Sequence, residues 1–195
     1  EKRSAAILDV GCGDGDLVRY LVSNGFTNIT AVDHDQDALK SFSGLNGVSQ
    51  IIRKVDYKFI KSLDKNYDLI VLKQMIYYFD RSECQKLLQE IRNKLSPQGT
   101  VIVEIFNGAL ISGFLTECKD PYILTSYNER SLTILMENTG FSKTSVYGIT
   151  SKIHGCKGFV LRALKLLWFK IYKSVIMLER GRDDQNPQFW QKSII

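Results

Sequence analysis

The chain has 195 residues, of which 44% are hydrophobic and 24% are charged, and this composition is typical of a globular domain rather than a disordered or fibrous chain. No run of 18 uncharged apolar residues occurs, and no charged-then-apolar leader opens the sequence, so we expect a cytoplasmic protein. The four cysteines form no Cys-x-x-Cys pair, which argues against a zinc cluster or a disulfide framework. We therefore expect reduced thiols and no metal site.

The net charge of +5 is unevenly distributed along the chain. Residues 157–182 contain seven of the 26 Lys and Arg residues but one of the 21 Asp and Glu residues, a net +6 that leaves −1 for the rest. The basic character thus belongs to one segment. It does not favour a nucleic-acid-binding surface spread over the domain.

Strands and helices are expected to alternate along the first half of the chain. Short apolar runs bounded by glycines or polar residues predict strands at residues 5–10, 28–33, 48–55, 67–72 and 100–106. Apolar residues at helical spacing predict helices at residues 14–22 and 35–42, and a third that is capped by Asp80 or Ser82 and ends before Pro97. These alternations indicate an α/β fold with a parallel sheet covered by helices on both faces.

The alternation lapses over residues 108–128. A segment of this length is long for a structureless loop, so we expect a functional lid or an element of a substrate site. Helical spacing resumes at residues 129–138, and strands are expected at 144–149 and 189–195, with the basic segment inserted between them. The sequence thus predicts a doubly wound, mostly parallel seven-stranded sheet with a helical insertion between the last two strands.

A glycine-rich loop follows the first predicted strand. Gly11, Gly13 and Gly15 let the backbone pass close to a ligand and adopt positive φ, and the N–H groups that begin the next helix face that ligand. Asp33 ends the second predicted strand, where its carboxylate can accept hydrogen bonds from the two hydroxyls of a ribose. Loop and acid together predict a site for a nucleotide-like cofactor.

Two alternatives stay open for this loop. It is a plain tight turn if Asp33 only caps the helix that begins at Asp35. The dinucleotide fingerprint Gly-x-Gly-x-x-Gly would instead indicate an NAD-dependent oxidoreductase. However, residue 16 is Asp and the third glycine falls one position early. The acids at positions 14 and 16 would also repel a pyrophosphate at that helix end.

The segment Ile7-Leu8-Asp9-Val10-Gly11-Cys12-Gly13-Asp14-Gly15 resembles the signature loop of the class I S-adenosylmethionine-dependent methyltransferases. The resemblance implies that Asp9 helps to hold the methionine end of S-adenosylmethionine and that Asp33 binds the ribose. His34 would border the adenosine, and the loop backbone would pass under the cofactor at Gly11, Cys12, Gly13 and Gly15. The resemblance covers residues 5–107 well and the rest of the chain only in the order of its elements.

Further positions extend the resemblance. Asp56 and Tyr57 follow the third predicted strand, where the family places an acid that meets the adenine amino group and an apolar neighbour against the ring; a plain turn is the alternative. Residues 67–72 and 77–79 resemble the family's fourth strand and the segment after it, so Leu72 and Lys73 would border the sulfonium. The resemblance implies one methyltransferase domain, residues 1–195, with a cofactor-binding half at 1–107 and an acceptor-side half at 108–195.

Candidates for acid–base catalysis are few. A hydroxyl acceptor benefits from a general base, whereas an amine must arrive neutral. Glu104, near the end of the fifth predicted strand, and His154, in a polar stretch, are the candidate bases; an ion pair and a surface position are their respective alternatives. Tyr77 stands where the family often has His, and it either lines the acceptor pocket or packs in the core.

Residues 158–180 combine apolar residues at helical spacing with interspersed Lys and Arg, which predicts a long amphipathic helix. One interpretation is a lid helix whose apolar face packs on the domain or on a second copy in a homodimer. The other is an interfacial helix whose Trp168, Phe169 and basic residues contact anionic lipid at the inner face of the membrane.

The segment Leu178-Glu179-Arg180-Gly181-Arg182, followed by Pro187, is loosely similar to the ends of methyltransferases associated with bacterial surface-polysaccharide synthesis. That similarity implies O-methylation of a sugar or other small-molecule hydroxyl, with a small molecule or a glycan as the substrate. The alternative from a different class is a non-catalytic interaction module that keeps the cofactor-binding fold.

Overall fold

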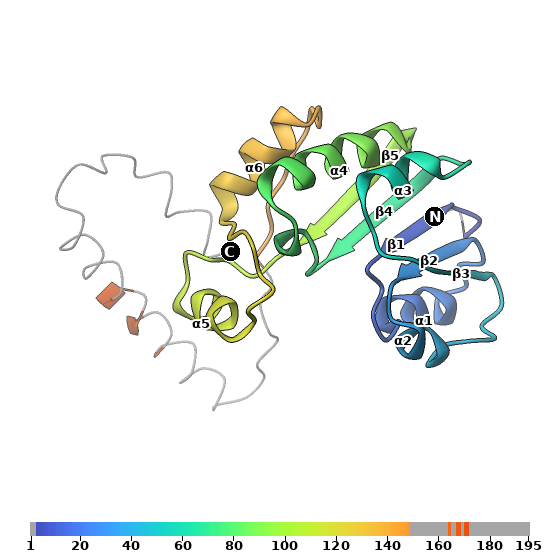
Figure 1. Ribbon diagram of the computed structural model, residues 1–195, viewed down its shortest axis with the longest axis horizontal. Coiled ribbons are helices and arrows are strands. Elements are labelled where there is room, and N and C mark those ends of the chain that lie inside the picture. Colours follow the sequence, from blue (N-terminus) through green and yellow to red (C-terminus); the bar gives the residue numbers. More distant parts are fainter. Residues whose placement is uncertain (1–2, 149–163, 165–166, 169, 172–195) are drawn as a thin grey trace. The chain divides into compact units, whose positions relative to one another are not determined.

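The structure is a computed structural model that describes residues 3–148 and residues 164, 167, 168, 170 and 171. Within these residues, five strands form one parallel sheet in the order β3-β2-β1-β4-β5 (Figure 1). The strands are β1 (Ile7–Val10), β2 (Ile29–Asp33), β3 (Val48–Ile52), β4 (Tyr67–Lys73) and β5 (Leu95–Glu104). The predicted α/β class and the parallel pairing are confirmed.

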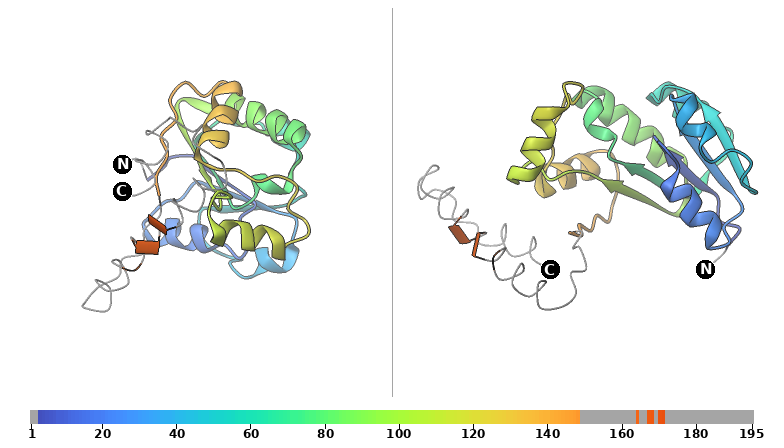
Figure 2. Two further views of the ribbon diagram at one scale, coloured as in Figure 1. Left: turned by 90° about the vertical axis from the view of Figure 1, so that its left-hand side faces the viewer. Right: turned by 90° about the horizontal axis from the view of Figure 1, so that it is seen from below.

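Helices cover both faces of this sheet. On one face lie α1 (Asp16–Ser23) and α2 (Gln36–Lys40), and on the other lie α3 (Tyr57–Ser62), α4 (Arg81–Asn93) and α6 (Glu129–Asn138) (Figure 1, Figure 2). A 3-10 turn, η1 (Ile76–Tyr78), follows β4, and α5 (Ile111–Lys119) follows β5. The arrangement is therefore doubly wound.

The two faces of the sheet bury two separate hydrophobic clusters, because side chains alternate along each strand. In β1, Ile7 belongs to a cluster with Val18 and Leu21 of α1. Its neighbour Leu8 belongs to the opposite cluster, together with Leu87 of α4. Strands that are apolar on both sides are typical of a parallel sheet between two helix layers.

The strand order reverses beside β1. The strands β2 and β3 lie on one side of β1, and β4 and β5 lie on the other. The chain leaving β1 enters a helix on one face, whereas the chain leaving β4 leads to a helix on the opposite face. Such a switch point leaves a crevice outside the carboxyl ends of the two strands, where doubly wound proteins bind their ligands.

Two of the seven predicted strands are absent from the described sheet. Residues 144–148, at the predicted sixth strand, have no regular secondary structure, so that prediction is wrong over its described part. Thr144, Val146 and Tyr147 have the β-propensity of a strand, but a strand also needs a partner for its backbone hydrogen bonds, and no pairing of the described strands includes these residues. The predicted seventh strand, residues 189–195, lies outside the described residues.

Several boundaries differ by a few residues, such as the end of β3 at Ile52, and three elements depart further from the sequence-based expectation. The helix α3 was not predicted and begins directly after Asp56. The helix α5 occupies part of the segment 108–128, where a lid or substrate element is expected. The strand β5 begins at Leu95 and runs past Pro97, because a register shift in its pairing with β4 accommodates the extra residues.

The chain divides into two compact units, Glu1–Thr144 and Ser145–Ile195. The division of a single domain at residue 107 stays a prediction. In the second unit, residues 164, 167, 168, 170 and 171 are helical, and the rest of the amphipathic helix predicted at 158–180 lies outside the described residues. Within the described part of the chain, no helix combines the length and the hydropathy needed to cross a membrane.

Candidate functional site at the glycine loop

The glycine loop between β1 and α1 is tied to the neighbouring strand β2. The backbone N–H groups of Gly11 and Cys12 both donate to the carbonyl oxygen of Val32, at 2.8 and 3.1 Å. Gly13 and Gly15 have φ of 50° and 76°, a region in which any residue with a Cβ is strained. A Cβ on Gly15 would also lie 2.2 Å from the Phe42 ring. The loop conformation therefore depends on glycine.

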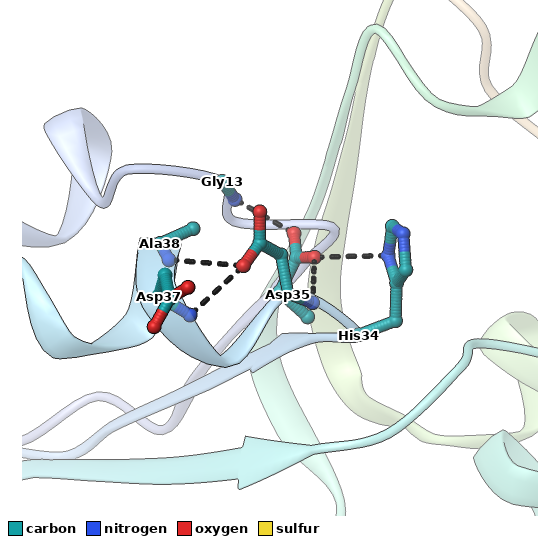
Figure 3. Close-up of polar contacts among 6 residues, drawn as sticks. Gly13, His34, Asp35, Asp37 and Ala38 are labelled. Atoms are coloured by element: carbon teal, nitrogen blue, oxygen red, sulfur yellow. Dashed lines mark hydrogen bonds and ion pairs between the residues drawn. The ribbon is translucent and has the colours of Figure 1, made fainter.

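Asp33 closes this loop from the end of β2. Its Oδ2 accepts a hydrogen bond from the N–H of Gly13 at 2.8 Å, and its Oδ1 accepts one from the N–H of Asp35 at 3.0 Å (Figure 3). Nδ1 of His34 lies 3.1 Å from Oδ1 of Asp33, and the imidazole side chain is 78% exposed. The side chain of Asp35 caps α2 through two backbone N–H groups. The alternative role expected for Asp33 was to cap this helix, but the cap is Asp35.

Asp9 is a buried carboxyl group in β1. The residue is 2% exposed, and its Oδ2 has no hydrogen-bond partner among the described residues. Burial raises the pKa of Asp9 to about 7, although the Lys73 ammonium lowers it and the Asp33 carboxylate raises it further. A buried carboxylate is costly unless a cation or donor compensates it. The Oδ2 atom therefore marks a position for a positively charged or hydrogen-bond-donating group of a ligand.

A cavity of about 180 Å³ lies at the switch point of the sheet. It is lined from both sides, by β1, the loop and the first residues of α1, and by the end of β4: Asp9, Gly11, Cys12, Asp14, Asp16, Leu17, Lys73 and Gln74. Four residues predicted to contact a cofactor, Asp9, Gly11, Cys12 and Lys73, thus meet at one cavity. Burial raises the pKa of Cys12 to about 12, so its thiol stays neutral and is not a nucleophile.

Gln74 and Glu104 form a polar pair at the carboxyl ends of β4 and β5. Nε2 of Gln74 donates to Oε1 of Glu104 at 3.1 Å, and the backbone N–H of Gln74 donates to the Glu104 carbonyl oxygen at 2.8 Å. Gln74 has φ of 53°, a left-handed conformation that strains a residue other than glycine. The two hydrogen bonds hold this strained residue and orient the Glu104 carboxylate. Gln74 lines the cavity, whereas Glu104 lies outside its lining.

Tyr77 lies in an aromatic group next to this pair. It is 6% exposed, its ring stacks on Phe106 with centroids 6.0 Å apart, and it contacts Tyr78 edge-on at 4.9 Å. The Tyr78 hydroxyl donates to Oδ2 of Asp120 at 2.8 Å, which joins η1 to the residue after α5. Burial above all, with Tyr78 and nearby acidic groups, raises the pKa of Tyr77. Its phenol is therefore neutral at neutral pH.

Other predicted site residues lie outside the lining of the cavity. Asp56 caps α3, with its Oδ1 accepting a hydrogen bond from the N–H of Phe59 at 2.6 Å. Tyr57 begins that helix, and Leu72 is fully buried in the core. Their roles at the adenine ring and the sulfonium stay predictions. His154 lies outside the described residues.

The sequence does not single out Asp14, Asp16, Leu17 and Gln74 of the cavity lining as site residues, nor Asp120, which contacts Tyr78. The position of Gln74, directly after Lys73 at the end of a strand, could have indicated a site residue. Its positive φ could not be predicted, because among residue types mainly glycine and asparagine indicate that conformation. Asp120 lies far from Tyr78 in the sequence, and their contact depends on how the chain returns after α5.

Known proteins share this architecture. A model of a methyltransferase domain matches residues 1–146. The chain is 28% identical over 121 residues to the ubiquinone biosynthesis O-methyltransferase of Rickettsia bellii (strain OSU 85-389). The aligned region covers 60% of this chain and 49% of the relative. It is 38% identical over 55 residues to the EEF1A lysine methyltransferase 2 of Mus musculus, covering 27% of this chain and 22% of the relative. The chain thus spans about half the length, or less, of these curated relatives.

Among solved structures, a SAM-dependent methyltransferase from Archaeoglobus fulgidus superposes with a TM-score of 0.63 at 21% identity, over 83% of this chain and 76% of that chain. This similarity shows that the fold is that of the Rossmann-like methyltransferases. The matched residues 1–146 contain the whole described sheet, the glycine loop and the cavity. Because that match covers most of its length, this chain belongs to the methyltransferase-domain family.

Proposed function

We propose that this protein is an S-adenosylmethionine-dependent methyltransferase that methylates a hydroxyl group of a small molecule or glycan. The observation that carries the proposal is Oδ2 of Asp9, a buried oxygen without a partner among the described residues, in the lining of the glycine-loop cavity. The amino-acid end of S-adenosylmethionine has an ammonium group, which supplies the positive charge that this carboxylate needs. Family membership supports the same assignment.

Asp33 would hold the ribose of this donor. A carboxylate oxygen accepts more than one hydrogen bond, so the bonds from Gly13 and Asp35 leave capacity for the ribose hydroxyls. The exposed ring of His34 would border the adenosine. Asp56 and Tyr57 follow β3, which is next to β2 in the sheet, and they would meet the adenine ring.

When bound, S-adenosylmethionine supplies a methyl group on a sulfonium, whose leaving group is already activated. The protein's task is then mainly to align donor and acceptor, which can supply much of the rate. Glu104, oriented by Gln74, would take the proton of the acceptor hydroxyl as a general base. Tyr77 would line the acceptor side together with Phe106. It would not act as the base, because its pKa is raised and its phenol stays neutral.

A sugar hydroxyl is the acceptor we propose. Its support is the loose similarity of residues 178–187 to methyltransferases of surface-polysaccharide synthesis, together with the O-methyltransferase activity named for the Rickettsia relative. The mouse relative is named for a lysine acceptor, so the shared segments favour the donor more strongly than the acceptor. Peripheral membrane contact through residues 158–180, a cytoplasmic location and a homodimer stay predictions.

A methyl-transfer assay tests this function. S-adenosylmethionine with a labelled methyl group would be incubated with monosaccharides, nucleotide sugars, phenols and a lysine-containing peptide. The expected result is labelled product from a hydroxyl compound, and none with the Asp33→Ala variant. Label on the peptide alone would replace the hydroxyl acceptor with an amine. Full binding of S-adenosylmethionine without transfer to any acceptor would favour the non-catalytic module.

A further inference from the structure

We infer that Lys73 binds the carboxylate of the amino-acid end of the methyl donor, so that the cavity recognises a zwitterion with Asp9 and Lys73 as its two charged contacts. This inference rests on the proposed function. The family resemblance implies that Lys73 borders the sulfonium. We infer instead that Lys73 contacts the carboxylate, at the other end of the amino-acid group.

The position of Lys73 follows from the register of the sheet. β1 and β4 are parallel, and Val10 is paired with Leu72, so Lys73 lies one residue beyond the last pair, level with Gly11. Asp9 and Lys73 thus line the cavity from two adjacent strands. The Lys73 ammonium acts on the Asp9 carboxyl group electrostatically, but no ion pair joins the two among the described residues.

The charges of the cavity lining favour this assignment. Its acidic residues are Asp9, Asp14 and Asp16, and Lys73 provides the positive side chain among the described residues that line it. The Asp16 carboxylate is already paired with the Arg19 guanidinium at 2.6 Å, outside the lining. An anionic group entering a cavity lined by three carboxyl groups needs a compensating cation. Lys73 is in the position to provide it.

Glu104 is the cross-strand neighbour of Lys73. Its Oε1 accepts the hydrogen bond from Gln74, and no ion pair joins Glu104 to Lys73 among the described residues. When the ligand ammonium compensates Asp9, the attraction between Asp9 and Lys73 weakens, and the ligand carboxylate restores a partner to the lysine. The two contacts therefore support each other.

Removal of Lys73 should change the affinity for the donor in opposite directions, depending on whether the lysine binds the carboxylate or only borders the sulfonium. Such a lysine would repel the sulfonium and the ammonium of the donor, and its removal would tighten binding. If the lysine instead binds the carboxylate, its removal should weaken the binding of the donor. Comparison of two ligands separates these effects: S-adenosylmethionine and its decarboxylated analogue, which keeps the sulfonium, ammonium and nucleoside.

The test is calorimetric titration of the full chain with both ligands at pH 8. For the Lys73→Met variant, we expect affinity for S-adenosylmethionine to fall about tenfold, at the low end for a charged hydrogen bond because Lys73 is exposed. Its affinity for the decarboxylated analogue should stay equal or rise. Lys73→Arg should restore most of the loss. Lys61→Met, at an exposed lysine of α3 outside the cavity lining, is the matched control and should bind both ligands as the parent does.

Three outcomes would overturn the inference. Equal losses for both ligands in Lys73→Met would mean that the lysine acts on the structure and not on the carboxylate. Tighter binding of both ligands would mean that it borders the sulfonium. If the parent protein bound neither ligand, the proposed function itself would fail, and this inference with it.

Discussion

Oδ2 of Asp33 accepts a hydrogen bond from the backbone N–H of Gly13 over 2.8 Å, so the acid at the end of β2 fixes the glycine loop that follows β1. The carboxylate proposed to hold the ribose is thus also part of the structure that positions the methionine end of the donor. Loop geometry and ribose binding are therefore coupled through one side chain, and a change at Asp33 should affect both.

Replacement of Asp33 by Ala should weaken both stability and donor binding. The backbone N–H groups of Gly13 and Asp35 lose their acceptor, which should lower the free energy of unfolding by about 1–3 kcal/mol. Affinity for S-adenosylhomocysteine should fall at least about tenfold. Urea unfolding and calorimetry measure the two effects. As a control, Asp35→Ala removes the cap of α2 and should cost about 1 kcal/mol with little effect on affinity; equal affinity losses in both variants would contradict the assignment.

Alanine at the two loop glycines should have unequal costs. Both have positive φ, so each substitution carries a backbone penalty of about 1 kcal/mol. At Gly13 nothing lies within 4 Å of a Cβ, whereas at Gly15 a Cβ would meet the Phe42 ring at 2.2 Å. Gly15→Ala should therefore lower the free energy of unfolding by about 2 kcal/mol more than Gly13→Ala. Similar values in thermal or urea unfolding would show that the ring of Phe42 yields easily.

The buried Asp9 should make stability depend on pH. Burial raises its pKa from 3.8 to about 7, so the folded state binds a proton that the unfolded state has released. The contribution of Asp9 to stability is then complete below pH 3.8, decreases as the pH rises through this window, and is lost above pH 7. Relative to the Asp9→Asn variant, the parent should lose about 3 kcal/mol between pH 4 and pH 7. A constant difference between the two proteins across this range would contradict the raised pKa.

The same group should make donor binding depend on pH in the opposite direction. The ligand ammonium favours the ionised form of Asp9, so binding should require loss of a proton below pH 7. The affinity of the parent for S-adenosylhomocysteine should therefore rise as much as about tenfold between pH 6 and pH 8. Asp9→Asn should bind weakly and with a flat profile. A flat profile in the parent would show that Asp9 does not contact the ammonium.

Tyr77 should contribute its ring rather than its hydroxyl to the reaction. Because burial raises the pKa of Tyr77, its phenol stays protonated, and Tyr77→Phe should keep the turnover of the parent within about threefold. Tyr77→Ala removes the ring stacked on Phe106 and should lower turnover while donor affinity changes little. Steady-state assays with the acceptor found in the labelling screen measure this. A large loss in Tyr77→Phe would assign the hydroxyl a direct role.

Much of the donor side of this site could be predicted from the sequence, because it depends on local signals. The glycines at 11, 13 and 15 all have positive φ, as a turn from strand to helix under a ligand requires. The acid expected at the end of the second strand is the last residue of β2. The helix expected at residues 129–138 has the bounds Glu129–Asn138, where the Asn128 cap supports the apolar periodicity.

The parts that could not be predicted depend on contacts between distant residues. That Asp9 is left without a partner for Oδ2 depends on packing around β1, and the strained Gln74 is held by Glu104 of another strand. The pair at 56 and 57 is a turn signal in the sequence, yet Asp56 caps a helix. Thr144 begins a segment with strand propensity that finds no ladder among the described strands, because propensity alone does not supply a pairing partner.

The central claim is that the glycine loop and Asp33 bind S-adenosylmethionine. Calorimetric titration of the full chain with S-adenosylhomocysteine and, separately, with NAD tests this most directly. We predict one S-adenosylhomocysteine bound per chain, with no heat of binding for NAD, and loss of the signal in Asp33→Ala. Binding of NAD alone would identify an oxidoreductase, and binding of neither ligand would leave a fold without its cofactor; either result would contradict the claim.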